Sequence, residues 1–259
     1  FIDHMGPAEM AAGKNMDVLP HPHIGLSTLT YLFEGSLDHK DSLGNDVRIV
    51  PGDVNLMIAG RGIVHSERTG RDVRRKPSRL SGIQSWLAQP LALEAADPAF
   101  TRVEAADLPV FESDTWSGRL ILGNYEGYCS PVESQWETLY LEIKMNQGAR
   151  FKILKVVEER ALYLVSGTIE IGGTIYASRQ MIVLQPGREI IVKAREDLHL
   201  LLLGGATMDG PRYIWWNFVS SSLEKIRSSA EDWKNNNFET IPGDGQEFIP
   251  LPDVPFPRE

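Results

Sequence analysis

The feature that most constrains the fold is a series of short alternating apolar runs closed by glycine or proline–glycine turns. The stretch "LSTLTYLFEG" (26–35) alternates apolar and polar residues and ends in Glu34-Gly35, and "RLSGIQSWLAQP" (79–90) alternates in the same way. A period of two places every second side chain on one face, as in a half-buried strand. Pro51-Gly52 supplies a turn, because proline presets φ and glycine tolerates positive φ. The sequence therefore predicts an all-β fold.

The second half of the chain repeats this pattern. A glycine closes a strand-like run at Gly35 and again at Gly167, and Pro51-Gly52 has an apparent counterpart in Pro186-Gly187. A pattern that recurs over so long a period indicates a duplicated domain, and 259 residues exceed the usual length of one domain. We therefore predict a duplicated β domain.

The two domains are predicted to span residues 1–128 and 129–259, and the second includes a C-terminal helix and an extended tail. Ser221 and Glu224 have the spacing of a capping box, which marks a helix N-terminus. The apolar residues that follow at helical spacing are Leu223, Ile226, Ala230 and Trp233. They predict one amphipathic helix that packs on a barrel, followed by the proline-rich tail.

Charge and composition exclude some classes of partner. The net charge of −9 and the pI of about 5.2 argue against direct binding to nucleic acid or to an anionic membrane surface. No apolar stretch is long enough to span a bilayer, and the first ten residues lack the pattern of a signal peptide. Cys129 stands alone, as is usual in a reducing compartment. These features predict a cytoplasmic protein, or a nuclear one in a eukaryote.

Two pairs of side chains carry the metal-binding signal. His21 and His23 in "HPH" lie two apart, and His65 and Glu67 in "HSE" lie two apart. In an extended strand each pair points to one face. If the two strands are neighbours in a small barrel, three imidazoles and one carboxylate converge, a set that suits a divalent metal and can leave coordination positions open. The alternative for a single pair is hydrogen-bonded histidines within a barrel.

The remaining polar positions give weaker signals. His39, in "LDHKDSLG", is predicted to be exposed or to support the site rather than to bind metal, and a pocket role is one interpretation of His4. At the places in the second block that match the ligand pairs, "ARFKILKV" and "LQPGREIIVKA" contain neither an HxH nor an HxE pattern. The second domain is therefore predicted to be metal-free, which gives one metal ion per chain.

Three side chains are candidates for a substrate pocket: Met57, Gln84 and Trp86. Gln84 and Trp86 lie two apart and share a face in a strand, although ordinary core packing explains Met57 and Trp86 equally well. The basic segment 68–79 follows the second ligand pair directly. It either steers an anionic substrate toward the site or is simply a solvated loop, and the solvated loop is the usual meaning of a charge run.

Over nearly its whole length the chain resembles the pirins of the cupin superfamily. The resemblance rests on motifs throughout the sequence: "DHMGP" (3–7), "HPHIGLSTLTYLFEG" (21–35), "PGDVNLMIAGRGIVHSE" (51–67), "GIQSWLAQP" (82–90) and "PRYIWWNFVSSS" (211–222). It implies a bicupin, that is, two tandem cupin (jelly-roll-like) β-barrels, whose N-terminal barrel holds iron through His21, His23, His65 and Glu67. One departure is Ser27, where many pirins have a glutamate that is not itself a ligand. The charge around the site is therefore expected to differ.

The resemblance implies a quercetin 2,3-dioxygenase activity, in which a flavonol ring is opened with loss of carbon monoxide. The cofactor is then Fe(II), with Mn, Ni, Co, Cu and Zn as other candidate divalent metals. The substrates are O2 and a small aromatic flavonol-like compound, and Glu67 would also take the proton of the substrate hydroxyl. Two alternatives stay open: an iron-dependent transcriptional cofactor, and a regulator that binds a metabolic enzyme through a protein–protein contact.

Overall fold

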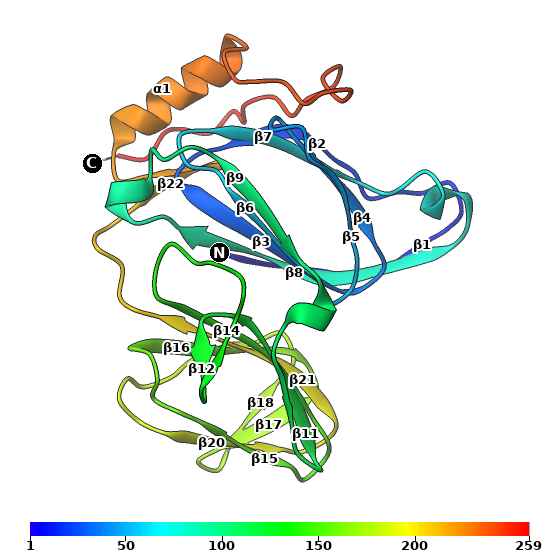
Figure 1. The fold of residues 1–259 in the computed structure, drawn as a ribbon, viewed down its shortest axis with the longest axis vertical. Helices are drawn as coiled ribbons and strands as arrows, with labels where there is room; N and C mark the ends of the chain where they lie inside the picture. Colours follow the sequence, from blue (N-terminus) through cyan, green and yellow to red (C-terminus); the bar gives the residue numbers. More distant parts are fainter. Residues whose placement is uncertain (259) are drawn as a thin grey trace. The chain divides into compact units, whose positions relative to one another are not determined.

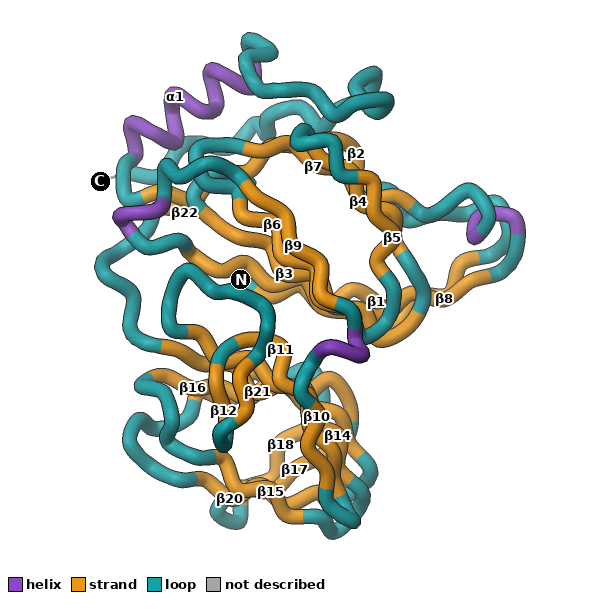
Figure 2. The backbone as a smooth tube through the Cα atoms, viewed as in Figure 1, coloured by secondary structure: helices purple, strands orange, loops and turns teal. Residues whose placement is uncertain are grey.

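A computed structural model describes residues 1–258, which form two compact units (Figures 1 and 2). Unit 1 contains Phe1–Ala105 together with the residues from Asp209 onward, and unit 2 contains Ala106–Met208. The chain therefore leaves unit 1, builds unit 2 and returns to unit 1. No helix among the described residues is long and apolar enough to cross a membrane.

The first part of unit 1 is a β-barrel made of two facing sheets, with strand orders β1-β8-β3-β6-β9 and β2-β7-β4-β5. His39 on β4 stacks on Phe100 of β9 with 4.6 Å between ring centroids, so side chains of the two sheets meet inside the barrel. The strand bounds are β1 (Ile2–Met10), β2 (Val18–His23), β3 (Leu26–Glu34), β4 (Leu37–Asp41), β5 (Asp46–Ile49), β6 (Val54–Ile58), β7 (Ile63–Arg68), β8 (Ser78–Ala88) and β9 (Ala99–Val103).

Unit 2 is a second β-barrel, with sheet orders β10-β11-β14-β21-β16-β19 and β15-β20-β17-β18 and a small hairpin, β12-β13. The strand bounds are β10 (Val110–Glu112), β11 (Trp116–Leu122), β12 (Asn124–Tyr125), β13 (Tyr128–Cys129), β14 (Thr138–Met145), β15 (Arg150–Ile153), β16 (Glu159–Ser166), β17 (Thr168–Ile171), β18 (Thr174–Ala177), β19 (Met181–Val183), β20 (Ile190–Ala194) and β21 (Leu198–Gly205). Short 3-10 helices lie in the two units at Val73–Arg75, Leu91–Leu93 and Ala105–Asp107.

The predicted pair of cupin barrels is confirmed, and the two barrels match strand for strand. The order β1-β8-β3-β6 in unit 1 corresponds to β14-β21-β16-β19 in unit 2, and β2-β7-β4-β5 corresponds to β15-β20-β17-β18. Gly35 and Gly167 close equivalent strands, and both have φ of +87°. A side chain at Gly35 would collide with the carbonyl oxygen of Arg79, so glycine is required there for space as well as for conformation.

The proline–glycine turns are not equivalent, however. Pro51-Gly52 joins β5 to β6, whereas Pro186-Gly187 joins β19 to β20, which correspond to β6 and β7. The similar spacing of the two dipeptides is therefore a coincidence. Strand pairing, and not turn composition, defines which residues of the two barrels are equivalent.

The domain division also differs from the predicted boundary between residues 128 and 129, which falls inside unit 2. The C-terminal helix and tail belong to unit 1, because Leu223 and Ile226 of the helix pack in one apolar cluster with Ile24 of the first barrel. Phe218 joins this cluster. The elements concerned are β22 (Tyr213–Trp215), β23 (Phe218–Ser220) and α1 (Leu223–Lys234).

Helix α1 begins one residue later than the capping-box spacing predicts. Ser222 is the N-cap, and its side chain accepts a hydrogen bond from the backbone N–H of Lys225. Ser221 is already engaged, because its backbone N–H and its hydroxyl both donate to the Glu94 carboxylate, at 2.9 and 2.8 Å. A long-range contact therefore moves the cap to the next serine.

Candidate metal centre

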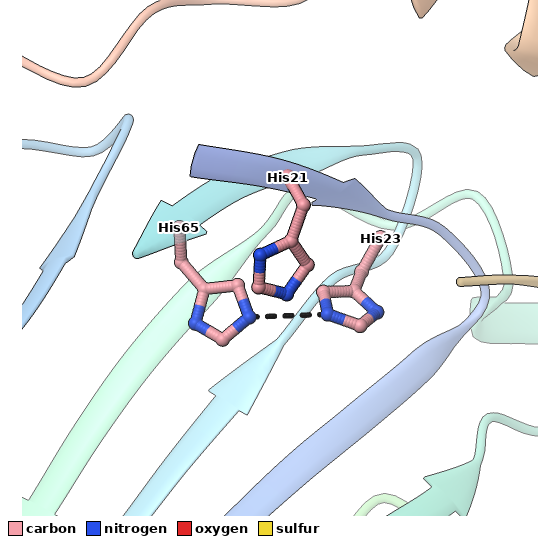
Figure 3. Close-up of side chains that lie close together, drawn as sticks. All are labelled: His21, His23 and His65. Carbon is pink, nitrogen blue, oxygen red and sulfur yellow. Dashed lines mark hydrogen bonds between the residues drawn. The ribbon is translucent and has the colours of Figure 1, made fainter. Parts of the chain in front are cut away.

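Strands β2 and β7 pair antiparallel and bring the two histidine-bearing segments together. His21 lies opposite His65 in the register of this pair. Figure 3 shows His21, His23 and His65 converging from the two strands. The Nε2 atoms of His23 and His65 lie 3.1 Å apart, and the ring centroids of His21 and His65 are separated by 4.4 Å. The predicted pairs of side chains on neighbouring strands are thus present.

The three imidazoles form a buried group of nitrogen donors. One ring nitrogen from each lies within 4.8 Å of the others, and each residue is at most 6% exposed. Burial lowers the pKa of His21 to about 4, and it holds the pKa of His23 and of His65 well below the usual value, with neighbouring imidazoles acting in the same direction. The rings are therefore neutral near pH 7, the form in which imidazole binds a metal.

A hydrogen bond to the backbone orients the His21 ring. Nδ1 of His21 lies 2.8 Å from the carbonyl oxygen of Leu19 and donates to it in the neutral ring. A ring that donates through one nitrogen offers the lone pair of the other, which is how metal-binding histidines are commonly fixed. This contact fits a metal between the three imidazoles.

Glu67 is the fourth predicted ligand, and it belongs to a second group of donor atoms. Its carboxylate clusters with ring nitrogens of His39 and His65, again within 4.8 Å. The Gln84 amide donates to both of its oxygens, at 2.9 and 3.1 Å, and the Thr30 hydroxyl lies 3.3 Å from Oε1. Burial raises the pKa of Glu67. The predicted ligands therefore form two overlapping groups that share His65.

The prediction of an exposed His39 was wrong, whereas a supporting position fits what is observed. His39 lies opposite Glu67 in the pairing of β4 with β7 and is 2% exposed. Its Nε2 lies 3.1 Å from the carboxylate of Asp41. The sequence "LDHKDSLG" suggested a hairpin end, but the strand continues through His39, and alternation directs this side chain inward.

The three predicted pocket residues are on strands of the facing sheet. Trp86 presents an edge-to-face contact to His23, with 5.4 Å between centroids, and Gln84 binds Glu67 as described above. Met57 is buried beside Phe100 and Ile63. All three therefore lie on the interior face of the barrel, which is where a substrate pocket would have to be.

Ser27, the departure from the family pattern, lies on the other face of its strand. Its cross-strand partners are Ile58 and Leu87, whereas the next residue, Thr28, pairs with Trp86 on the interior face. Since strand residues alternate between faces, Ser27 points away from the histidines. The expected change of charge around the site therefore does not arise from this position.

The C-terminal tail fastens the ligand-bearing strands from outside the barrel. Asp244 accepts hydrogen bonds from Ser66 Oγ at 2.7 Å and from Arg68 Nε and Nη2 at 2.7 and 2.6 Å. The backbone N–H of Ile249 donates to the carbonyl oxygen of Pro20, next to His21. Burial raises the pKa of Asp244, but hydrogen bonds from Arg68 and Ser66 outweigh it and leave the pKa below its ordinary value. No sequence signal indicated this strap, residues 241–249.

The basic segment 68–79 is partly held in ion pairs. Arg68 binds Asp244, and Arg74 binds the Asp17 carboxylate at 2.6 Å. Arg48, from β5, binds Asp72 at 2.8 Å in the same charged groove. These contacts show that much of the segment's charge has an internal structural partner, while its steering role stays a prediction.

The comparisons with known proteins identify the family. The family model "Pirin" matches residues 1–87, and "Pirin C-terminal cupin domain" matches residues 140–239. A pirin-like protein of Caulobacter vibrioides is 43% identical over 256 residues, which cover 98% of this chain and 88% of that protein. The chain belongs to the pirin family. The family model for the second domain thus extends over α1, which the structure places in unit 1.

Two further relatives of this pirin are named for an enzymatic activity. The crystal structure titled quercetin 2,3-dioxygenase from Acinetobacter baumannii matches with a TM-score of 0.91 and 32% identity, over 100% of this chain and 86% of that one. A protein of Pseudomonas aeruginosa that is provisionally named a quercetin 2,3-dioxygenase is 34% identical over 92% of this chain and 74% of its own length.

Proposed function

We propose that this pirin is a metal-dependent dioxygenase of the quercetin 2,3-dioxygenase type. The observation that carries the proposal is a buried set of metal-donor atoms. The imidazoles of His21, His23 and His65 converge, and the Glu67 carboxylate lies close to a ring nitrogen of His65. The two relatives named as quercetin 2,3-dioxygenases support it. Three imidazoles and a carboxylate suit a divalent metal, and we propose Fe(II) as the native one, with one ion per chain.

The metal, when bound, supplies a Lewis-acidic and redox-active centre at which a deprotonated substrate oxygen and O2 can be brought together. The chain's own residues hold that centre and accept the proton of the substrate hydroxyl. We assign Glu67 as the base that takes the proton of the substrate hydroxyl, because its carboxylate is buried and lies within 4.8 Å of a ring nitrogen of the candidate ligand His65. Gln84 and Thr30 hold its carboxylate in place through the hydrogen bonds described above.

The experiment is an aerobic assay of the purified protein loaded in turn with Fe(II), Mn, Co, Ni, Cu or Zn. Quercetin and O2 should be consumed together, carbon monoxide should be released, and a chelator should abolish the reaction. Metal content measured on the same samples shows whether an inactive sample lacked metal.

Glu67→Gln separates metal binding from proton transfer. The amide keeps one oxygen donor but cannot accept the hydroxyl proton, so turnover should fall by about a hundredfold or more in protein that still contains metal. Metal-replete wild type without O2 uptake across several flavonols and catechols would contradict the proposal. That result would favour a protein-binding role in transcription or enzyme regulation.

A further inference from the structure

A row of polar side chains crosses the interior face of the unit 1 barrel. Gln84 on β8 pairs with Thr30 on β3, and Thr30 pairs with Asn55 on β6. Arg102 on β9 continues the row beyond Asn55. Because cross-strand partners point to the same side of a sheet, and because Gln84 and Thr30 both reach Glu67, the whole row faces the strands that carry the candidate ligands.

Asn55 is the member of this row with unused hydrogen-bonding capacity. It is 2% exposed, and among residues 1–258 neither its amide nitrogen nor its amide oxygen has a hydrogen-bond partner. The neighbouring side chains already have other hydrogen-bond partners. The Thr30 hydroxyl accepts from Gln84 and donates to Glu67, and Arg102 donates to Asp53 at 2.6 Å. A buried amide without partners is costly, so such a group calls for a partner that enters the barrel.

A second row, apolar at three of its four positions and called the apolar row below, lies next to the polar one on the same face. Trp86, Thr28, Met57 and Phe100 are successive cross-strand partners, two residues along each strand from the polar row. The indole N–H of Trp86 also has no partner among the described residues. The interior face thus carries aromatic and apolar side chains and, beside them, one amide that can both donate and accept a hydrogen bond.

Unit 2 shows that a barrel of this topology does not need the polar row. Its strands have the same order, and Leu162, which corresponds to Thr30, pairs with Leu202 and Ile182. These three residues correspond to Thr30, Gln84 and Asn55 in turn, and all three belong to or pack against the unit 2 core. The polar row is therefore a feature of unit 1, beyond what the fold requires.

We propose that Asn55 is a specificity-determining residue that binds the oxygen functions of a planar ring substrate. The ring would lie over Trp86 and Met57. The Asn55 amide N–H would donate to the carbonyl, and the amide oxygen would accept from the adjacent hydroxyl before Glu67 takes its proton. The ligand class is a planar aromatic compound with neighbouring hydroxyl and carbonyl groups. This inference rests on the proposed function, which it deepens, but it concerns recognition rather than turnover.

The test measures ligand binding without O2, on full-length protein loaded with Ni(II). The probes are 3-hydroxyflavone, which carries the hydroxyl–carbonyl pair, and flavone, which lacks the hydroxyl. Asn55→Leu keeps a similar volume and removes both hydrogen-bonding atoms. It should weaken 3-hydroxyflavone about tenfold and flavone by a smaller factor, about threefold, in calorimetric titrations.

Met57→Leu is the matched control. It lies two residues along the same strand, on the apolar row, and conserves volume and apolar character. It should change the affinity for both probes by the same factor. Equal factors for the two probes in Asn55→Leu, wild-type affinity in that variant, or failure of the wild type to bind either probe would overturn the proposal.

Thermal unfolding distinguishes a ligand-binding amide from a merely structural one. Replacing a buried unpartnered amide by leucine should raise the melting temperature of the ligand-free protein, because a desolvation cost is removed. A lower melting temperature would show that Asn55 is satisfied within the fold, for example by a buried water, and would overturn the inference. If Asn55→Leu does not fold, the test uses Asn55→Gln, which displaces the amide by one methylene. This variant should also weaken 3-hydroxyflavone by a larger factor than flavone.

The outcomes separate this inference from the proposed activity. Selective loss of 3-hydroxyflavone binding in a protein that consumes no O2 would overturn the dioxygenase proposal and leave the recognition role of Asn55 intact. If the wild type consumes O2 normally but Asn55→Leu weakens both probes by the same factor, the dioxygenase proposal stands and the recognition role of Asn55 is overturned.

Discussion

The two barrels of this pirin have the same strand order and opposite interiors. In the β2–β7 pair of unit 1, His21 lies opposite His65, and the corresponding positions of the β15–β20 pair in unit 2 are Ile153 and Ile190. Ile153 is buried in a continuous apolar core, and Ile190 packs against that core. The difference shows that the histidines are not needed to build the barrel. Their burial lowers stability, and such a cost is expected where a protein binds a ligand or catalyses a reaction.

The same contrast holds one residue pair further along. Glu67 lies opposite His39 in the β4–β7 pair, and the corresponding residue of β20 is Val192, which is buried in the unit 2 core. Unit 2 therefore acts as an internal reference, in which His21, His65 and Glu67 of unit 1 have apolar structural counterparts. The predictions below use this reference, and they run from the largest expected effect to the smallest.

The largest effect is expected from removing a ligand. His65→Ala should reduce metal affinity by about a hundredfold or more, because His65 belongs to both groups of donor atoms. The counterpart variant, Ile190→Ala, should destabilise unit 2 and leave the metal content at one ion per chain. Titration with Ni(II) and elemental analysis measure both. A second equivalent bound within unit 2, or full occupancy in His65→Ala, would break the asymmetry between the barrels.

Acid should destabilise the metal-free protein through unit 1. The ordinary pKa of His21 is 6.5, and burial lowers it to about 4 in the folded chain. Between these values the unfolded chain binds a proton that the folded chain does not, so stability is lost as the pH falls from 6.5 to 4 and is unaffected by His21 above 6.5. His21 alone accounts for about 3 kcal/mol over this range.

Urea unfolding of chelator-treated protein, followed by hydrogen exchange on peptides from each barrel, measures this loss. His21→Ile, which copies the unit 2 residue Ile153, should remove most of the pH dependence in peptides from β2 and β7. Equal acid sensitivity of the two barrels in the wild type would contradict the assignment.

The strap should affect metal binding from outside the barrel. Asp244→Ala removes the hydrogen bonds that hold Ser66 and Arg68 on either side of Glu67, and it should weaken metal binding about tenfold. Asp72→Ala is the control. It removes another aspartate–arginine pair of the same groove, in which the arginine, Arg48, lies on β5 rather than β7, and it should leave the affinity for metal unchanged. The absorption spectrum of the Co(II)-loaded protein should shift in the first variant alone. Identical spectra for both variants would exclude a positioning role for Asp244.

The smallest effect concerns the assignment of α1 to unit 1. Ser222→Ala removes the N-cap and should cost about 1 kcal/mol. The loss should show in hydrogen exchange of unit 1 peptides and leave β14–β21 unchanged. Ser221→Ala, at the position where the capping box predicted the cap, instead removes a contact to Glu94 and should not increase exchange within the first turn of α1.

The fold could be predicted because its signal is local. Alternation with a period of two marks strands, and the duplicated pattern marks two barrels, so the class and the strand-borne histidine pairs follow from short windows of sequence. The spacing of His21 with His23, and of His65 with Glu67, indicates shared faces. That they converge required the pairing of β2 with β7, which the resemblance to pirins supplied.

The features that escaped prediction depend on long-range contacts. Ser66 and Asp244 are separated by 178 positions, and nothing near either residue indicates that they meet. No motif surrounds Asn55 in the sequence. Two structural observations single it out: its amide has no hydrogen-bond partner among the described residues, and an apolar residue, Ile182, takes its place in unit 2. His39 was misread because a turn follows close behind it, while the burial of its side chain is set by Glu67 and Phe100 on other strands.

The discontinuity of unit 1 has a consequence during synthesis. The ribosome makes the strands that carry His21, His23, His65 and Glu67 first, and then the whole of unit 2, before Asp244 and Ile249 emerge. At about 5–20 residues per second, the nascent first barrel spends roughly 7 to 28 seconds without its strap. Under the proposed metal site, full-strength metal uptake is linked to release of the nearly complete chain, and a truncated product should retain all four candidate ligands yet bind metal weakly.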